Sequence, residues 1–218
     1  MLIDLHIHTR PLSPCSSLVI EEAIHVAKAK GLDGICLVEH DLLWDKDEIE
    51  CLKEAYDFLI LRGIEVNTNY GHLVAFGLEI YEEAFFYLEN LLEQVKAAGG
   101  VLIAVHPFRD PHYIRGNYGI GQPSLTPTDA SRRHLFNFVT GLEVYNGQST
   151  SRENWVSVEV GRLLNLVALG GSDAHSADEV GQCVTVFQEP IQGEKDLIRE
   201  IKAGRLVALG PGWPLRCD

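Results

Sequence analysis

The stretch MLIDLHIHTR, residues 1–10, opens the chain with the pattern of a β-strand. Side chains alternate between the two faces of a strand, so Leu5 and Ile7 are expected on one face and His6 and His8 on the other. A solvated edge strand and a functional site explain this pair of histidines equally well. The positions of the other ionisable residues decide between the two interpretations.

Apolar segments typical of strands recur along the chain and alternate with segments that carry helical signals. The expected helices cover residues 17–30, 46–61, 81–98, 149–164 and 194–203. The expected strands cover residues 2–8, 34–40, 63–67, 72–77, 101–107, 141–146, 166–175, 183–187 and 205–210. Alternation of this kind predicts a parallel sheet, and this many units favour a closed or nearly closed barrel over an open, doubly wound sheet.

The composition is that of one globular domain, residues 1–218. The 31 acidic and 18 basic residues give a formal net charge of −13, which disfavours a stable nucleic-acid partner and an anionic membrane surface. Five scattered cysteines without a Cys-x-x-Cys pair, and no apolar run near the ~18 residues of a membrane span, indicate a cytoplasmic protein. The segment 107–131, rich in proline and glycine, predicts a long functional loop.

Ionisable residues gather at one end of the expected strands. The histidines and acids found within or directly after an apolar strand segment are His6, His8, His40, Glu65, His106, Asp173 and His175. The carboxyl ends of parallel strands in a barrel meet on one face, so these side chains are expected to converge. Imidazoles and carboxylates in a partly dry cavity repel and lose hydration unless divalent cations join them. The sequence therefore predicts two or three ions with nitrogen and oxygen ligands, which suit Zn, Mn or Fe.

Five motifs, in the same order along the chain, resemble those of the PHP (polymerase and histidinol phosphatase) superfamily of metal-dependent phosphoesterases. They are DLHIHT (4–9), VEHD (38–41), GIEVN (63–67), AVHPFR (104–109) and GSDAHSADEVG (171–181). The resemblance covers nearly the whole chain. It implies an α/β fold of the PHP type, a distorted (β/α)7 TIM-like barrel, and hydrolysis of phosphate esters at a cluster of two or three metal ions.

The same resemblance assigns ligands to three ions. The implied ligands are His6, His8, Glu65 and Asp173 for the first ion, the bridging Glu65 with His106 and His72 for the second, and His40 with His175 for the third. The candidate catalytic residues are Glu65, Arg109 and His175. Glu65 bridges two ions, and Arg109 holds the phosphate oxygens through its planar fork of donors. Either a histidine near the third site, His175, or a metal-bound water protonates the leaving alcohol.

Some positions depart from the family pattern or leave two roles open. The segment after the first motif carries no acid or histidine, so either Cys15 supplies a ligand there or the third site lacks one. Glu39 stands where family members usually have Asp. Glu143 either contacts a metal directly or orients a ligating imidazole, and Asp4 either orients an imidazole or hydrogen-bonds the backbone in the barrel floor.

The sequence leaves the substrate and two alternative functions open. The acidic composition favours a small phosphomonoester, a nucleotide-derived ester or a short oligonucleotide over long nucleic acid. One alternative is a metal-binding regulatory or structural module without turnover. The other is an amidohydrolase-type C–N hydrolase; such enzymes usually have a ligating lysine after a strand, and no expected strand ends in lysine. The oligomeric state is open.

Overall fold

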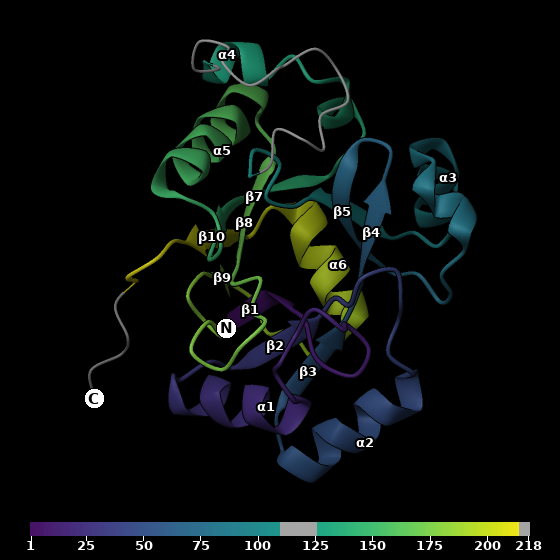
Figure 1. Cartoon of the computed structure of the whole chain (residues 1–218), viewed down its shortest axis with the longest axis vertical. Coiled ribbons are helices and arrows are strands. Elements are labelled where there is room, and N and C mark those ends of the chain that lie inside the picture. Colours follow the sequence, from purple (N-terminus) through teal and green to yellow (C-terminus); the bar gives the residue numbers. More distant parts are fainter. Residues whose placement is uncertain (110–125, 214–218) are drawn as a thin grey trace.

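The computed structural model describes residues 1–109 and 126–213, and its strands form two five-stranded sheets (Figure 1). The first sheet has the order β10-β9-β1-β2-β3, with β1 (Leu2–Ile7), β2 (Gly34–Leu37), β3 (Leu59–Arg62), β9 (Val184–Phe187) and β10 (Leu206–Leu209). The second sheet has the order β4-β5-β6-β7-β8, with β4 (Ile64–Thr68), β5 (Gly71–Phe76), β6 (Val101–Ala104), β7 (Gly141–Asn146) and β8 (Val167–Gly171).

Helices pack against both sheets (Figure 1). They are α1 (Ile20–Ala29), α2 (Lys46–Tyr56), α3 (Leu88–Ala97), α4 (Pro127–Ala130), α5 (Ser151–Leu164) and α6 (Glu194–Ala203), with the 3-10 helices η1 (Glu83–Phe86) and η2 (His134–Asn137). In the first sheet, α1 contacts β2 and α2 contacts β3, whereas α5 contacts β7 of the second sheet. The long helix α5 begins with a capping box, in which Thr150 and Glu153 satisfy each other's backbone N–H groups.

An apolar cluster between the two sheets holds them together. It includes Leu5 from the first sheet and Val74 and Ile103 from the second, all buried. Ile7 belongs to a different cluster, which contains the apolar face of α1. The expectation that Leu5 and Ile7 share one face is therefore wrong, because the pairing of β1 with β2 shifts register between Asp4 and Ile7.

Backbone hydrogen bonds join the two sheets at two seams. At the first seam, Ile7 and Ala174 form a parallel bridge; at the second, His40 and Glu65 form another. The N–H of Glu65 donates to the carbonyl of Glu39 at 3.0 Å. The α/β class is confirmed. At these two seams, however, the sheets are joined by single β-bridges, whereas a closed barrel has a continuous ladder of hydrogen bonds between every pair of neighbouring strands. No closed TIM-like barrel is found in the part of the chain that the structure describes.

Only part of each sheet is parallel, in contrast to the expected parallel sheet. The β4–β5, β5–β6, β1–β9 and β9–β10 pairs are antiparallel. Segments 63–67 and 72–77 form the β4–β5 hairpin, whose turn is too short for the crossover that parallel strands require. The expected helix 46–61 ends at Tyr56, because Asp57 adopts a left-handed conformation and the following residues form β3.

The expected loop 107–131 contains α4 near its end, and residues 110–125 lie outside the described residues. The four described cysteines are free thiols: Cys15, Cys36, Cys51 and Cys183. Among the helices of residues 1–109 and 126–213, none combines the length and the apolar character needed to cross a bilayer.

Candidate metal centre

All eight predicted metal ligands lie together beside the two seams. They come from β1 (His6, His8), β2 (His40), β4 (Glu65), β5 (His72), β6 (His106) and β8 (Asp173, His175), either within the strand or directly after it. Their ligand atoms form four groups in which all atoms lie within 4.8 Å of one another: His6, His8 and Glu65; His6, His106 and Asp173; His40, Glu65 and His72; His8, His40 and His175. The grouping differs from the expected one because His72 lies with His40 and His106 lies with Asp173.

Glu65 is at the centre of the cluster and is 1% exposed. Its Oε1 lies 2.8 Å from Nδ1 of His72 and 2.9 Å from Nε2 of His106. Its Oε2 lies 2.9 Å from Nδ1 of His40 and 3.2 Å from Nε2 of His8. Burial by itself raises the pKa of Glu65, but hydrogen bonds from the surrounding histidines, with that from His106 the largest, outweigh burial and hold its pKa well below the usual range. A charged carboxylate with each oxygen facing different histidines has the geometry of a bridging ligand.

His6 presents a defined nitrogen to the cluster. Its Nδ1 lies 2.9 Å from Oε1 of Glu143, and because a carboxylate only accepts, Nδ1 carries the proton and donates. The lone pair is then on Nε2, which lies 3.1 Å from Nε2 of His8 and 3.5 Å from Oδ1 of Asp173. Burial lowers the pKa of His6, but Glu143 and Asp173 raise it well above the ordinary value. A metal ion supplies the same positive charge without a proton.

Two orphan carboxylate oxygens show that the residues fit divalent cations. Oε2 of Glu65 and Oδ1 of Asp173 are fully buried, and neither finds a hydrogen-bond partner of acceptable geometry within residues 1–109 and 126–213, although histidine nitrogens lie near both. An unsatisfied buried carboxylate oxygen is costly. Both atoms point into the groups of imidazole nitrogens described above, so cations ligated by nitrogen and oxygen would satisfy them.

The backbone at the site is constrained to bring these groups close. His106 and Asp173 both have positive φ, 29° and 56°, a region that residues other than glycine rarely occupy. A Cβ on Gly171 would lie 2.5 Å from Cβ of His6 and 2.8 Å from Oε1 of Glu143, so only glycine allows this approach. Strain of this kind persists where the surrounding structure requires it, often at functional sites.

Asn146, which the sequence analysis missed, connects three site residues. Its Nδ2 donates to Oε2 of Glu143 at 2.9 Å and lies 3.3 Å from Oδ2 of Asp173, and its Oδ1 accepts from Arg109 at 3.2 Å. Asn154 of α5 holds the backbone of Asn146 through its side-chain amide. The signal was present in the sequence, because Asn146 ends the strand GLEVYN just as the histidines end theirs.

Asp4 and Glu39 support the site without facing the ligand groups. Asp4 accepts hydrogen bonds from the backbone N–H groups of His6, Ser172 and Gly181, and burial raises the pKa of Asp4 to about 6. Glu39 accepts from the backbone N–H of Thr9 at 2.9 Å and from the Trp44 side chain at 2.9 Å, and thereby fixes the chain after His8.

Arg109 lies at the edge of the cluster, where it pairs with Asp173 and Asn146. Burial lowers the pKa of Arg109, but the carboxylate of Asp173 outweighs it and raises the pKa. The expected phosphate-binding residue is thus at the site, with its guanidinium held by a predicted metal ligand.

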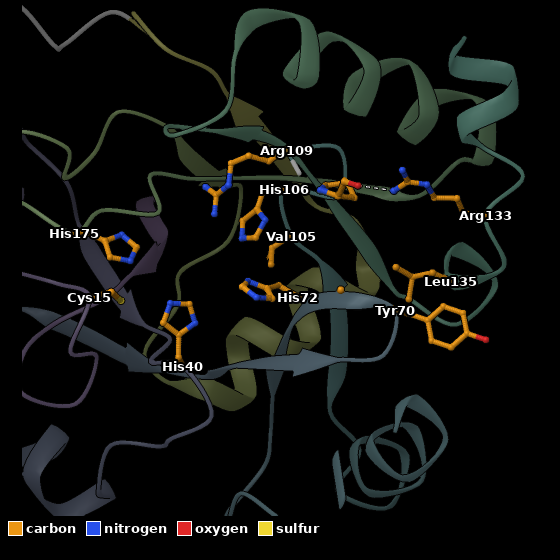
Figure 2. A pocket seen from close by; sticks show the side chains of 12 residues that line it. Cys15, His40, Tyr70, His72, Val105, His106, Arg109, Arg133, Leu135 and His175 are labelled. Atoms are coloured by element: carbon orange, nitrogen blue, oxygen red, sulfur yellow. Dashed lines mark hydrogen bonds between the residues drawn. The ribbon is translucent and has the colours of Figure 1, made fainter. Parts of the chain in front are cut away.

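A cavity of about 370 Å³ opens beside the cluster (Figure 2). Its lining includes His40, His72, His106, His175 and Arg109. Cys15 also lines the cavity, yet none of the ligand groups found among the described residues contains it.

Comparisons with known proteins bear on the fold that carries this cluster. The PHP-associated family model (PHP_C) matches residues 151–206, from α5 to β10. A solved two-domain protein of Bacteroides vulgatus that contains a predicted PHP-like metal-dependent phosphoesterase shares the fold, with a TM-score of 0.63 and 20% identity over 97% of this chain and 65% of that chain. The chain thus contains a PHP-associated segment, and its fold is shared with a PHP-like protein.

Other proteins similar to this chain include two uncharacterized proteins of Methanocaldococcus jannaschii. One is 29% identical over 50% of this chain and 68% of its own length. The other is 28% identical over 87% of this chain and 71% of its own length. Among solved structures, PsfC of Pseudomonas syringae has a TM-score of 0.64 at 21% identity, covering 97% of this chain and 91% of its own. An amidohydrolase of Chromobacterium violaceum, with bound sulfate and no metal, has a TM-score of 0.62 at 18% identity, and the match covers 94% of this chain and 97% of the amidohydrolase.

Glu143 allows a direct test of how His6 is oriented. Glu143→Gln is expected to weaken metal binding about 10–100-fold, because the carboxylate fixes the Nδ1–H tautomer and raises the basicity of Nε2. Competitive titration against a chromophoric chelator measures the affinity. Glu54→Gln, which changes an exposed carboxylate on α2, is the matched control and should bind metal like the wild type. Equal affinity in both variants would contradict the orienting role.

Proposed function

We propose that this protein hydrolyses a phosphate ester, either a small phosphomonoester or a nucleotide-derived ester, at a centre of two or three divalent ions. The observation that carries the proposal is the position of Glu65. This buried carboxylate presents its two oxygens to different histidines beside a cavity of about 370 Å³. The mixed nitrogen and oxygen donors suit Zn, Mn or Fe.

When bound, divalent ions activate water at neutral pH and neutralise charge on the phosphate oxygens. The residues of the chain position the ions and the substrate phosphate. Glu65 and Asp173 supply negative charge on two sides of the cluster, and the imidazoles supply neutral nitrogens. Arg109 lies at the cavity with a guanidinium that can rotate from Asp173 toward phosphate oxygens and donate to two of them at once.

We assign His175 to ion binding, together with His8 and His40, and not to proton donation. Its Nδ1 lies 2.9 Å from the backbone carbonyl of Asp173, which only accepts, so Nδ1 carries the proton. Burial and the nearby His8 lower the pKa of His175 and favour the neutral ring. A neutral imidazole with its lone pair on Nε2 is a metal ligand, whereas a proton donor to the leaving alcohol would need the charged ring.

The similarity to an amidohydrolase makes C–N bond hydrolysis the second candidate. The amidohydrolase type of site usually contains a ligating lysine after a strand. None of the ten described strands ends in lysine, and no lysine lines the described part of the cavity. We therefore place phosphoester hydrolysis first.

A screen with defined metals separates these functions. Purified protein is analysed for its metal content and then assayed with Mn, Zn or Fe supplied separately. We expect two to three ions per chain and release of phosphate from p-nitrophenyl phosphate or from a small alkyl phosphate. A diester and a short oligonucleotide test the wider substrate class, and a p-nitroanilide tests C–N hydrolysis. A fully loaded protein that is inert toward every phosphoester would instead support a metal-binding regulatory module.

A further inference from the structure

The cavity has two chemically different ends (Figure 2). At one end, His40 and His175 lie toward Cys15. At the other end, beyond His72, lie Tyr70, Leu135 and Arg133. The first end contains the candidate ion ligands. The second end contains a phenol ring, an apolar side chain and a guanidinium, so it cannot hold cations and has a different role.

Tyr70 is fixed at the tip of the β4–β5 hairpin although its ring is exposed. Its side chain is 39% exposed, and the backbone N–H of Tyr70 donates to Oγ1 of Thr68 at 3.1 Å. The Thr68 hydroxyl donates to the Gly71 carbonyl at 2.6 Å, and Gly71 has a φ of 107°. Asn69 ties the same tip to η1 and α3, through its N–H to Phe86 and its side chain to Leu88. A large aromatic residue at a turn that usually favours small polar residues is thus held rigidly over the cavity.

The opposite wall of this end is also held in place. Arg133 donates from Nη1 to the carbonyl of Pro107 at 2.5 Å, and its guanidinium lies 4.6 Å from the ring centroid of Phe108. Leu135, only 5% exposed, forms the apolar surface between Arg133 and Tyr70 (Figure 2). Guanidinium groups and phenol rings both stack on flat π systems.

Aromatic side chains continue from Tyr70 onto the outer surface. The rings of Tyr70 and His134 have centroids 6.5 Å apart, and those of His134 and Phe138 are 4.8 Å apart. Phe138 is 39% exposed, like Tyr70. Exposed aromatic residues scattered singly need no explanation, but this row begins inside the cavity that contains the ion ligands.

We propose that the end of the cavity formed by Tyr70, Leu135 and Arg133 binds a flat aromatic ring in the alcohol part of the phosphoester substrate. The proposal rests on the proposed function, because it places the phosphate at the ions beside His72. Tyr70 and His72 both line the cavity and are separated in the chain only by Gly71, so the ring site lies next to the candidate ion ligands. A short linker therefore joins the ring to the phosphate.

Binding of matched phosphonates to the metal-loaded protein tests this ring site independently of turnover. Benzylphosphonate and cyclohexylmethylphosphonate have the same charge and similar size, and only the first has an aromatic ring. Calorimetry with Mn-loaded wild type should show benzylphosphonate binding at least about fivefold more tightly, as expected for one stacked ring. Tyr70→Leu should reduce this preference to less than about twofold, and Tyr70→Phe should keep it.

Controls separate the ring site from the proposed function. Tyr87→Leu removes an exposed aromatic residue that does not line the cavity, and it should leave the preference unchanged. Methylphosphonate reports phosphate binding alone. The ring site is refuted, while the proposed function stands, if methylphosphonate binds but the aromatic ring of benzylphosphonate adds no affinity. The same holds if the preference for benzylphosphonate over cyclohexylmethylphosphonate survives Tyr70→Leu. If the preference is observed but no phosphoester is hydrolysed, the proposed function fails and the ring site stands. If no phosphonate binds, both are refuted.

Discussion

Glu65→Gln is expected to lower phosphoester turnover at least about a thousandfold, or roughly 4 kcal/mol of transition-state stabilisation, while leaving the fold intact. Glutamine has nearly the shape of glutamate but no charge, and one of its two terminal atoms is an amide nitrogen that cannot ligate a metal. In the wild type, Oε1 and Oε2 face different histidines, so whichever atom becomes nitrogen, one side of the bridge is lost. Steady-state kinetics and metal content per chain are the measurements.

The matched control for this variant is Glu54→Gln, which removes one carboxylate from an exposed position. It should keep the activity and metal content of the wild type. Circular dichroism of Glu65→Gln should match the wild type, since the bridge between His40 and Glu65 is made by backbone atoms. A folded Glu65→Gln protein with near-normal turnover would eliminate the bridging role, whereas loss of the fold would show that the carboxylate is structural.

The position of the site could be read from the sequence because of a property of β-strands. Histidines placed directly after apolar segments, as His6, His40 and His106 are, must lie at the carboxyl ends of strands. Such ends meet wherever the strands run parallel, so their convergence did not depend on the barrel being closed. Glu65 and His72 lie in a hairpin, not in parallel units, but the seam between His40 and Glu65 brings that hairpin to the same place.

The features of the fold and site that the sequence did not predict depend on three-dimensional contacts that local sequence patterns do not encode. The bulge in β1 changes which core cluster Ile7 joins, and nothing in an alternating apolar sequence indicates it. Asn146 acts through Arg109 and Asp173, which lie 37 and 27 positions away, and an asparagine at the end of a strand is common. The ion pair between Arg109 and Asp173 joins residues 64 positions apart, so spacing could not reveal it.

Removal of metal should abolish phosphoester hydrolysis and destabilise the native protein. The reason for the loss of stability is the burial of Glu65 and Asp173, each about 1% exposed, whose orphan oxygens lose their ligand when the ions leave. Ions that bind only the native state add about 2.7 kcal/mol at a free concentration 100 times Kd. For a chain of this size, that corresponds to a rise in melting temperature of roughly 5–11 °C.

Thermal melts of chelator-treated protein across a series of Mn or Zn concentrations measure this shift, and assays on the same samples measure activity. The melting temperature should keep rising with the logarithm of metal concentration above Kd, whereas activity should follow the occupancy of the site and level off above Kd. Asp173→Asn should flatten the metal dependence, because it removes the charge of one orphan carboxylate, whereas Glu54→Gln should reproduce the wild-type curve. A melting temperature independent of metal in the wild type would mean that the surrounding histidines and Arg109 stabilise the buried carboxylates without metal. The cluster would then be a polar core and not a metal centre.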